Sequence, residues 1–336
     1  MARVDGSKAP TLVQPSDSTE KSGGWWPWLR RGLTLAFFVV VAGLLVRFGS
    51  AVEWDGVWRS ARAQAPATLL LAAGLAVMSH ALVASYDLIG RHVTGHGLSV
   101  PRVWLVAWVS YTFNLNLGAL VGGAGFRWRL YSRLGLDTGV IAQVYALSVV
   151  TNWLAYLVLL GATLAWTPIQ LPADWQLSRQ GLTALGIFLP LLSLAYVLAC
   201  ACATRRRWQW RGHTLALPSG RVAAVQLLLS AINWSLIAGI LYILLGQQIG
   251  YSQVLAVTLL AAVAGAVTHV PAGLGVVEAV FVSLLGAQMP QSEILAALLT
   301  YRAIYYLGPL MIGSVAYGIT EFLLRQPDGR PVGAPR

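Results

Sequence analysis

The sequence is poor in charged residues, which make up only 10% of its 336 residues, while 57% are hydrophobic. A soluble domain carries about 25% charged residues. Acidic residues are especially scarce, with 12 Asp and Glu against 23 Lys and Arg, so the net charge is +11. The arginines are spread over short loops and form no basic domain that would bind nucleic acid. The composition therefore predicts an integral membrane protein with little chain left for a separate soluble domain.

Motifs of catalysis are missing as well. The chain contains no G-x-S-x-G elbow, no H-E-x-x-H, no P-loop and no paired CxxC. Its 5 histidines and 12 acids are too scattered to form a metal site. Cys200 and Cys202 lie in an apolar stretch, where two reduced, buried small residues are the favoured interpretation. We therefore expect no enzyme activity, no catalytic residue, no metal and no cofactor.

Long apolar segments divide the chain into membrane spans. A span needs about 20 apolar residues, and six segments qualify: 32–48, 67–89, 139–166, 182–203, 222–245 and 294–323. Two more apolar segments, 103–134 and 252–287, are interrupted by Gly- and Pro-rich patches. Backbone groups released from helical bonding cannot face lipid, because each unpaired group costs several kcal/mol there. The broken segments are therefore expected to be covered by protein or to line a cavity.

The distribution of basic residues predicts that both broken segments are re-entrant hairpins. If each enters and leaves on one side, most of the 23 Lys and Arg lie on the side of the amino terminus, as the positive-inside rule requires of the cytoplasmic side. If the first broken segment crosses fully, Arg127, Arg129, Arg133 and the arginines of 205–221 move outside. The hairpin arrangement places both termini in the cytoplasm.

Two hairpins facing opposite sides make an inverted repeat, the architecture of many carriers. The predicted fold is all-α and polytopic, with about six full spans and two re-entrant broken-helix hairpins in this repeat. The predicted segments are a disordered cytoplasmic tail (1–28), a transmembrane domain (29–325) with repeats at about 67–166 and 222–323 joined by the span 182–203, and a second cytoplasmic tail (326–336).

The first hairpin carries two arginines just past its glycines. Arg127 and Arg129 offer planar donor forks that suit phosphate. They are candidates to bind a lipid headgroup, and positive-inside anchors with snorkelling side chains explain them equally well. Asn114 and Asn116 are expected to bond backbone groups at the break and to join the same headgroup site.

Small and helix-breaking residues mark the tips where each hairpin turns and where it would gate. These residues are Gly123 and Gly125 in the first hairpin, and His269, Pro271, Gly273 and Gly275 in the second. Pro271 removes a donor and ends its helix. His269 can relay a proton, but a neutral histidine that caps freed carbonyls is the favoured interpretation.

Charged residues inside predicted spans form a second set of candidates. Glu278 is an expensive intramembrane carboxylate, and a charge pair with Arg302 in the last span is favoured over a place on the translocation path. Asp87 is expected to bond Arg91 at i+4; the alternative is that it stages a coupling ion with His80. Asn152 and Asn233 are expected to make hydrogen bonds between helices.

Four strings resemble a known family: GGAGFRWRLYSRLGL, TNWLAYL, HVPAGLGVVEAVF and AALLTYRAIYY. They closely resemble the lysylphosphatidylglycerol synthase transmembrane-region family, over residues 28–324. The resemblance implies a flippase-like membrane domain of the kind that moves a modified lipid between leaflets. Full-length members carry a separate soluble synthase domain, which we expect this chain to lack. Residues 122–133 and 269–278 are the positions that carry over as candidate elements of the lipid path.

Three functions follow as hypotheses. The first is an inner-membrane lipid transporter or flippase that moves or presents an anionic phospholipid, or a polyprenyl-phosphate lipid, between leaflets. The second is a carrier of a small polar solute or ion, with His269, Glu278 and Arg302 as its coupling relay. The third is a non-transporting partner of an envelope lipid-transfer machine. A lateral opening to lipid would favour the first, and a closed aqueous cavity the second. The expected partners are membrane phospholipids and, for the third hypothesis, envelope lipid-transfer proteins.

Overall fold

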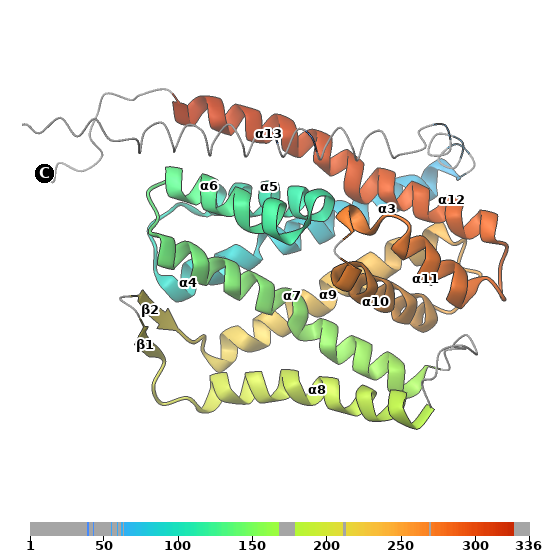
Figure 1. The fold of residues 1–336 in the computed structure, drawn as a ribbon, viewed down its shortest axis with the longest axis horizontal. Helices are drawn as coiled ribbons and strands as arrows, with labels where there is room; N and C mark the ends of the chain where they lie inside the picture. The colour runs from blue at the N-terminus through green and yellow to red at the C-terminus, as the bar shows by residue number, and fades with distance from the viewer. Residues whose placement is uncertain are drawn as a thin grey trace, which may run out of the picture. The chain divides into compact units, whose positions relative to one another are not determined.

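The computed structural model describes residues 64–167, 179–210, 213–268 and 270–325, together with residues 39, 43, 55, 59 and 62. Nearly all of them belong to one compact unit within Leu44–Arg336. The described chain is almost entirely helical (Figure 1), apart from a short hairpin of strands β1 (Arg207–Trp210) and β2 (His213–Ala216). In this part of the chain seven helical segments are long and apolar enough to cross a membrane, which confirms the all-α polytopic fold.

The predicted spans correspond to observed helices within a few residues. The span predicted at 67–89 is α3 (Pro66–Ala84) followed by α4 (Tyr86–Thr94). The next three full spans are α7 (Thr138–Trp166), α8 (Arg179–Cys202) and α9 (Gly220–Leu244). The last span is α12 (Gln291–Arg302), a short π-helix η3 (Ala303–Leu307) and α13 (Gly308–Arg325). The segment predicted at 32–48 lies outside the described residues, except for positions 39 and 43.

The first broken segment folds back on itself. It consists of α5 (Val100–Gly118), the π-helix η1 (Ala119–Gly125) and α6 (Phe126–Arg133). The rings of Phe113 and Phe126 stack with centroids 4.0 Å apart. In a straight helix, 13 residues would separate them by about 20 Å, so Val100–Arg133 is a hairpin although its length would suffice for a crossing. In Figure 1, α5 and α6 lie side by side.

The turn of this hairpin differs from the prediction that Gly123 and Gly125 make it. The chain changes direction at Gly118, whose φ of +83° is open to glycine but rarely to other residues. Gly125 instead has helical dihedrals at the start of α6. Gly122 permits close approach of the two limbs, because a Cβ there would clash with the carbonyl group of Phe113.

The second hairpin is formed by α10 (Tyr251–Thr268) and α11 (Val276–Leu285), with a short 3-10 turn η2 (Pro271–Gly273) between them. Here the predicted glycines do turn the chain: φ is +60° at Gly273 and +79° at Gly275, and Ala272 is also left-handed at +54°. Pro271 begins the 3-10 turn, and His269 lies outside the described residues.

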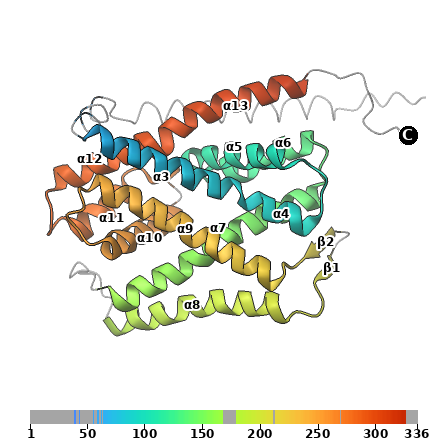
Figure 2. The ribbon, with the colours of Figure 1, turned by 180° about the vertical axis from the view of Figure 1, so that it is seen from behind.

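The two hairpins open toward opposite ends of the described unit. Figures 1 and 2 show α5 and α6 returning toward the end that holds β1, β2 and the last turn of α13, whereas α10 and α11 return toward the end where α12 begins. We call the first of these the basic end, because it carries Arg91, Arg102, Arg133, Arg205 and Arg221. The opposed hairpins agree with the predicted inverted repeat. The cytoplasmic assignment of the basic end stays a prediction.

Candidate functional site

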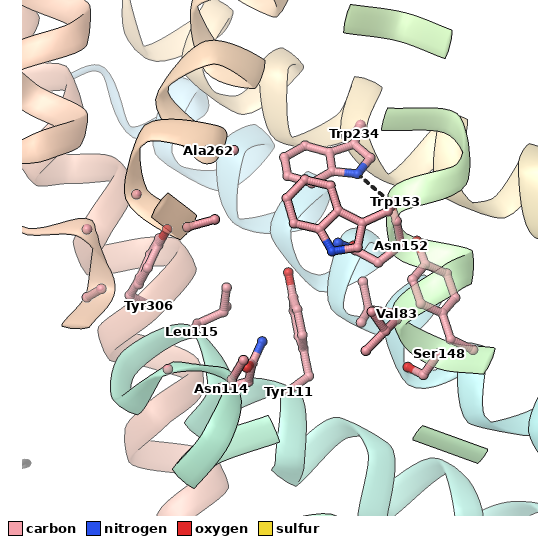
Figure 3. A pocket seen from close by; sticks show the side chains of 18 of the residues that line it. Val83, Tyr111, Asn114, Leu115, Ser148, Asn152, Trp153, Trp234, Ala262 and Tyr306 are labelled. Atoms are coloured by element: carbon pink, nitrogen blue, oxygen red, sulfur yellow. Dashed lines mark hydrogen bonds between the residues drawn. The ribbon is translucent and has the colours of Figure 1, made fainter. Parts of the chain in front are cut away.

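A cavity of about 380 Å³ lies where the two hairpin tips meet (Figure 3). The first tip contributes Gly118 and Ala119, and the second contributes Ala272 and Gly273. From α7, the residues Ser148, Val149, Asn152 and Trp153 line one wall. Because these residues lie at the midpoint of the 29-residue helix α7, both tips end near the middle of the span. The cavity therefore occupies the position expected of a site between inverted repeats.

The walls of this cavity mix polar and aromatic side chains. Asn114, Asn152 and Arg127 supply hydrogen-bond donors, and Trp153 and Trp234 supply indole rings. The backbone carbonyl of Asn152 accepts bonds from Ser230 Oγ (2.9 Å) and Trp234 Nε1 (2.9 Å). The sequence predicted that the side chain of Asn152 would make the interhelical bonds. The observed bonds use its backbone carbonyl instead, and its side chain lines the cavity.

The cavity opens sideways through an apolar rim. Among its lining residues, Ala119, Val149 and Ala266 are exposed at the surface. Leu120 and Val267 stand beside them and are 84% and 70% exposed. A large exposed apolar side chain halfway along a span faces hydrocarbon in a membrane protein. We therefore infer that this side of the cavity faces lipid.

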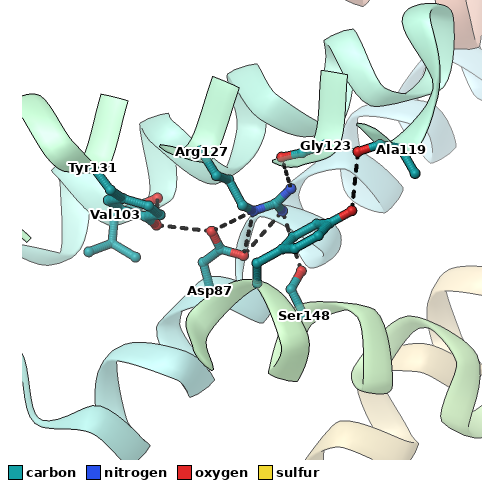
Figure 4. A network of polar contacts seen from close by, with 8 residues as sticks. Asp87, Val103, Ala119, Gly123, Arg127, Tyr131 and Ser148 are labelled. Atoms are coloured by element: carbon teal, nitrogen blue, oxygen red, sulfur yellow. Dashed lines mark hydrogen bonds and ion pairs between the residues drawn. The ribbon is translucent and has the colours of Figure 1, made fainter. Parts of the chain in front are cut away.

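Arg127 lies against the cavity in a buried polar cluster (Figure 4). Its Nε lies 2.9 Å from Asp87 Oδ2, and its Nη2 lies 3.2 Å from Asp87 Oδ1. Nη1 donates to the Gly123 carbonyl (3.2 Å) and Nη2 donates to Ser148 Oγ (3.3 Å). Tyr131 donates its hydroxyl proton to Asp87 Oδ2 (2.9 Å). The cluster joins the tip of the first hairpin to α4 and α7.

This cluster corrects two predictions. Asp87 pairs with Arg127, 40 residues away, whereas Arg91 donates to the Leu98 carbonyl (2.6 Å). The imidazole of His80 contacts the Tyr305 carbonyl (3.1 Å) and does not share an ion site with Asp87. Arg127 is only 4% exposed, and Asp87 neutralises its charge. It is therefore neither a free phosphate ligand nor a snorkelling anchor. It lines the cavity as one partner of an ion pair.

Arg129 is also paired. Its Nη2 lies 2.8 Å from Glu321 Oε1, and Arg133 Nη1 lies 2.7 Å from the same oxygen. The two arginines fasten α6 to the last turns of α13. Asn116 donates to the Thr112 carbonyl (2.9 Å) and is fully buried, in line with bonding of backbone groups near the break. Only Asn114 of the predicted headgroup residues presents a side chain to the cavity without a carboxylate partner.

Glu278 and Arg302 form the second buried cluster. Arg302 Nε lies 2.7 Å from Glu278 Oε1, and its Nη2 lies 3.0 Å from Oε2. The same guanidinium donates to the carbonyls of Ala272 (2.8 Å) and Gly273 (3.2 Å), while the Gly275 amide donates to Glu278 Oε2 (2.9 Å). The pair satisfies the backbone groups that the broken helix releases at the second tip.

The two clusters are built alike on opposite hairpins. In each, a guanidinium binds a carboxylate and backbone carbonyl groups of a hairpin tip, and lies over a tyrosine ring: 5.3 Å above Tyr145 for Arg127, 5.7 Å above Tyr306 for Arg302. The two clusters differ in where the arginine comes from. Arg127 belongs to the hairpin whose tip it binds, whereas Arg302 belongs to the span that follows the second hairpin. We call these clusters the Arg127 clamp and the Arg302 clamp.

A chain of buried hydroxyl groups lies behind the cavity and was missed by sequence reasoning. Tyr111 and Tyr305 share a hydrogen bond of 3.0 Å, Tyr305 and Ser79 share one of 2.7 Å, and Ser79 donates to Asn233 Oδ1 (2.6 Å). The last contact is the interhelical bond predicted for Asn233. Ser79 and Tyr111 are ordinary residues in apolar helices, so no sequence signal distinguishes them.

These features define a polytopic α-helical membrane protein with two opposed hairpins around a central, laterally open cavity. The chain belongs to the family described as the lysylphosphatidylglycerol synthase TM region, whose model matches residues 33–313. Within the described residues no group of three or more His, Cys, Asp or Glu is placed to hold a metal ion.

Three relatives of the chain illustrate the range of the family. It is 41% identical to the inner membrane protein YbhN of Escherichia coli, over 90% of this chain and 95% of that protein. It is 31% identical to protein slr0712 of Synechocystis, over 82% of this chain and 87% of that protein. A phosphatidylglycerol lysyltransferase of Staphylococcus haemolyticus is 28% identical over 70% of this chain, which corresponds to only 27% of the longer enzyme.

Proposed function

We propose that this protein moves a phospholipid between the leaflets of the bacterial inner membrane. The headgroup crosses through the central cavity while the acyl chains stay in the bilayer. The observation that carries the proposal is the lateral opening: a polar cavity at mid-span with an apolar, exposed rim. Such a shape fits an amphipathic cargo, whose polar part needs donors and whose apolar part needs contact with lipid.

The cavity's chemistry supports a headgroup that contains phosphate. The side-chain amides of Asn114 and Asn152 line the cavity and can donate hydrogen bonds to a headgroup, whereas the guanidinium of Arg127 is engaged by Asp87. Phosphate oxygens accept such bonds strongly. An anionic phospholipid and a polyprenyl phosphate share this group, and both remain candidate cargoes. The names of an inner membrane protein and of an enzyme of phosphatidylglycerol among the relatives agree with this membrane and this class of lipid.

The clamps give the proposal a mechanism. Each tip is held by guanidinium bonds to its backbone carbonyls: to Gly123 in the Arg127 clamp, and to Ala272 and Gly273 in the Arg302 clamp. Release of one clamp would let one hairpin move while the other stays shut. Alternating access in inverted-repeat carriers uses such movements of one half against the other.

A leaflet-exchange assay in liposomes tests the proposal. The purified protein is reconstituted with a trace of acyl-labelled fluorescent phosphatidylglycerol, phosphatidylethanolamine or polyprenyl phosphate, and external dithionite bleaches the outer leaflet. We expect the protein to raise the bleached fraction above half for at least one lipid. Exchange at the rate of empty vesicles for all three would refute the proposal.

A matched pair of variants ties the result to the cavity. Val149→Trp places a large side chain at the rim, where Val149 lines the cavity and is 38% exposed. Ala146→Trp makes a similar change at an exposed position of the same helix that does not line the cavity. We expect only the first variant to stop exchange. Equal activity of both would show that lipid takes another path.

The same vesicles separate the two competing hypotheses. Release of an entrapped small polar solute without lipid exchange would favour a solute carrier. Stoichiometric lipid binding with neither exchange nor release would favour a partner that presents lipid to an envelope machine. In the structure Glu278 and Arg302 bond each other and backbone groups, an arrangement that suits a structural pair better than a coupling relay.

A further inference from the structure

A second recess lies on the surface between α4 and α9, apart from the central cavity. Its volume is about 360 Å³, and its walls are Ser85, Leu88, Ile89, His92, Arg221, Val222, Val225 and Leu229. Ser85, the N-cap residue of α4, and the α4 residues Leu88, Ile89 and His92 follow the spacing i, i+3, i+4, i+7 and therefore share one face of that helix. Asp87 points to the other side of α4, into the Arg127 clamp. The α4–α9 groove is thus distinct from the proposed path.

The groove is polar at one end and apolar along the rest. His92 lies in the last turn of α4 and Arg221 in the first turn of α9, so the two helices run antiparallel and bring both side chains to the basic end. From there the groove runs along α4 for about 10 Å, past Leu88 and Ile89 to the N-cap residue Ser85. Facing them on α9 are Val222, Val225 and Leu229.

We propose that the α4–α9 groove binds one acyl chain of an anionic phospholipid whose phosphate is held by Arg221 and His92. Charge complementarity supports this occupant, because no acidic side chain lines the groove and Arg221 and His92 are both exposed. Arg221 has no ion pair among the described residues. The order of the groups along the groove also matches a lipid, because hydrogen-bond donors lie at the basic end and apolar side chains line the rest of the groove.

The groove does not depend on the proposed transport. A lipid bound there would lie against α4, the helix that carries Asp87. The bound lipid is therefore a fixed component at the flank of the first hairpin, and its presence is independent of whether any lipid crosses the cavity.

Photocrosslinking tests the groove directly. The full chain is reconstituted in phosphatidylcholine vesicles that contain phosphatidylglycerol with a diazirine on one acyl chain, and adducts are mapped by mass spectrometry. We expect adducts concentrated on residues 85–92 and 221–229. An even spread over these helices and the exposed face of α8 would mean bulk lipid only and would overturn the proposal.

Two matched pairs of variants separate the apolar and the charged parts. Val225→Trp fills the groove and should abolish its adducts, whereas Leu228→Trp, on the same helix but outside the groove, should keep them. Arg221→Gln should weaken labelling by the anionic lipid about fivefold, the effect of one basic residue near the membrane surface. Arg102→Gln, at another exposed arginine of the basic end, should not.

Other occupants would be recognised in a parallel experiment, in which a photoreactive amino acid replaces Leu229 in the groove and the lipid carries no diazirine. Crosslinks from the groove to residues 32–48, or to a second copy of the chain, would show that protein fills it and would overturn the proposal. Unchanged labelling in Val225→Trp, with the variant eluting as a single folded species, would do the same. Failure of lipid exchange with intact groove labelling would refute the transport proposal alone.

Discussion

At the scale of residues, the molecule keeps its deepest charges in pairs. Asp87 is fully buried and Arg127 is 4% exposed, and the carboxylate accepts hydrogen bonds from Arg127 and Tyr131. A buried charge without its partner is costly, whereas a matched pair recovers much of the desolvation penalty. The pairs therefore hold the hairpin tips in place without leaving net charge in the membrane.

Removing one partner of the Arg127 clamp should harm the protein more than removing both. We expect Asp87→Asn alone to cost about 3–5 kcal/mol, because the guanidinium of Arg127 is left buried and uncompensated. The double variant Asp87→Asn/Arg127→Gln should unfold at a higher temperature than either single variant. Scanning fluorimetry in detergent measures this, and simple addition of the two losses would contradict it.

The Arg302 clamp should be weaker, since the Glu278 side chain is 21% exposed. Glu278→Gln should loosen the second tip at a cost of about 1.5–3 kcal/mol, the worth of a hydrogen bond to a charged group. We expect a cysteine at Val270, in a chain without Cys200 and Cys202, to react faster with a maleimide. Glu293→Gln, at an exposed acid, is the control. Equal rates in both variants would mean that Glu278 does not hold the tip.

Sequence spacing could find one of these pairs but not the other. Glu278 and Arg302 were each the conspicuous charge of an apolar segment, and the structure joins them. Asp87 had a local candidate in Arg91, and its real partner comes from the next hairpin. Local spacing favours i+4 partners, and only the fold-back of α5 and α6 brings Arg127 to α4.

At the scale of elements, the hairpins depend on close contact between their limbs. Gly122 lies against the backbone of Phe113, and the stacked rings of Phe113 and Phe126 lie nearby. The bounds of the broken segments were predictable from apolar length. The place of the turn was not, because Gly118 stands one position after an ordinary Leu and takes its left-handed φ only when the limbs pack.

Gly122→Ala should therefore damage the first hairpin. Its Cβ would clash with a main-chain carbonyl group that cannot move aside like a side chain. We expect a loss of about 3 kcal/mol, the upper end for overpacking, and a fall in the yield of monodisperse protein. Gly74→Ala in α3, where nothing lies within 4 Å of a new Cβ, should be neutral or stabilising. Similar yields for both variants would argue against tight limb packing.

At the scale of the whole molecule, the opposed hairpins set the topology. Apolar runs and arginine distribution predicted this arrangement, since both act through average properties of long segments. The cavity and the α4–α9 groove were not predictable. The groove depends on how side chains of two helices leave space between them, and the cavity depends on side chains from most of the helices in the described unit.

Cysteine accessibility checks the inversion. In a chain without its two native cysteines, we introduce Asp137→Cys, which follows the first hairpin, and Gln288→Cys, which follows the second; both positions are exposed. An impermeant maleimide added to intact cells should label only position 288 if the basic end faces the cytoplasm, as the positive-inside rule predicts. Labelling of both positions, or of position 137 alone, would refute the predicted orientation.

The last span contacts both hairpins. Arg129 and Arg133 tie α6 to Glu321 near the end of α13, while Arg302, in the same last span, grips the opposite tip. If transport moves the hairpins, we expect the last span to couple them, so that a displacement of one tip changes the position of the other.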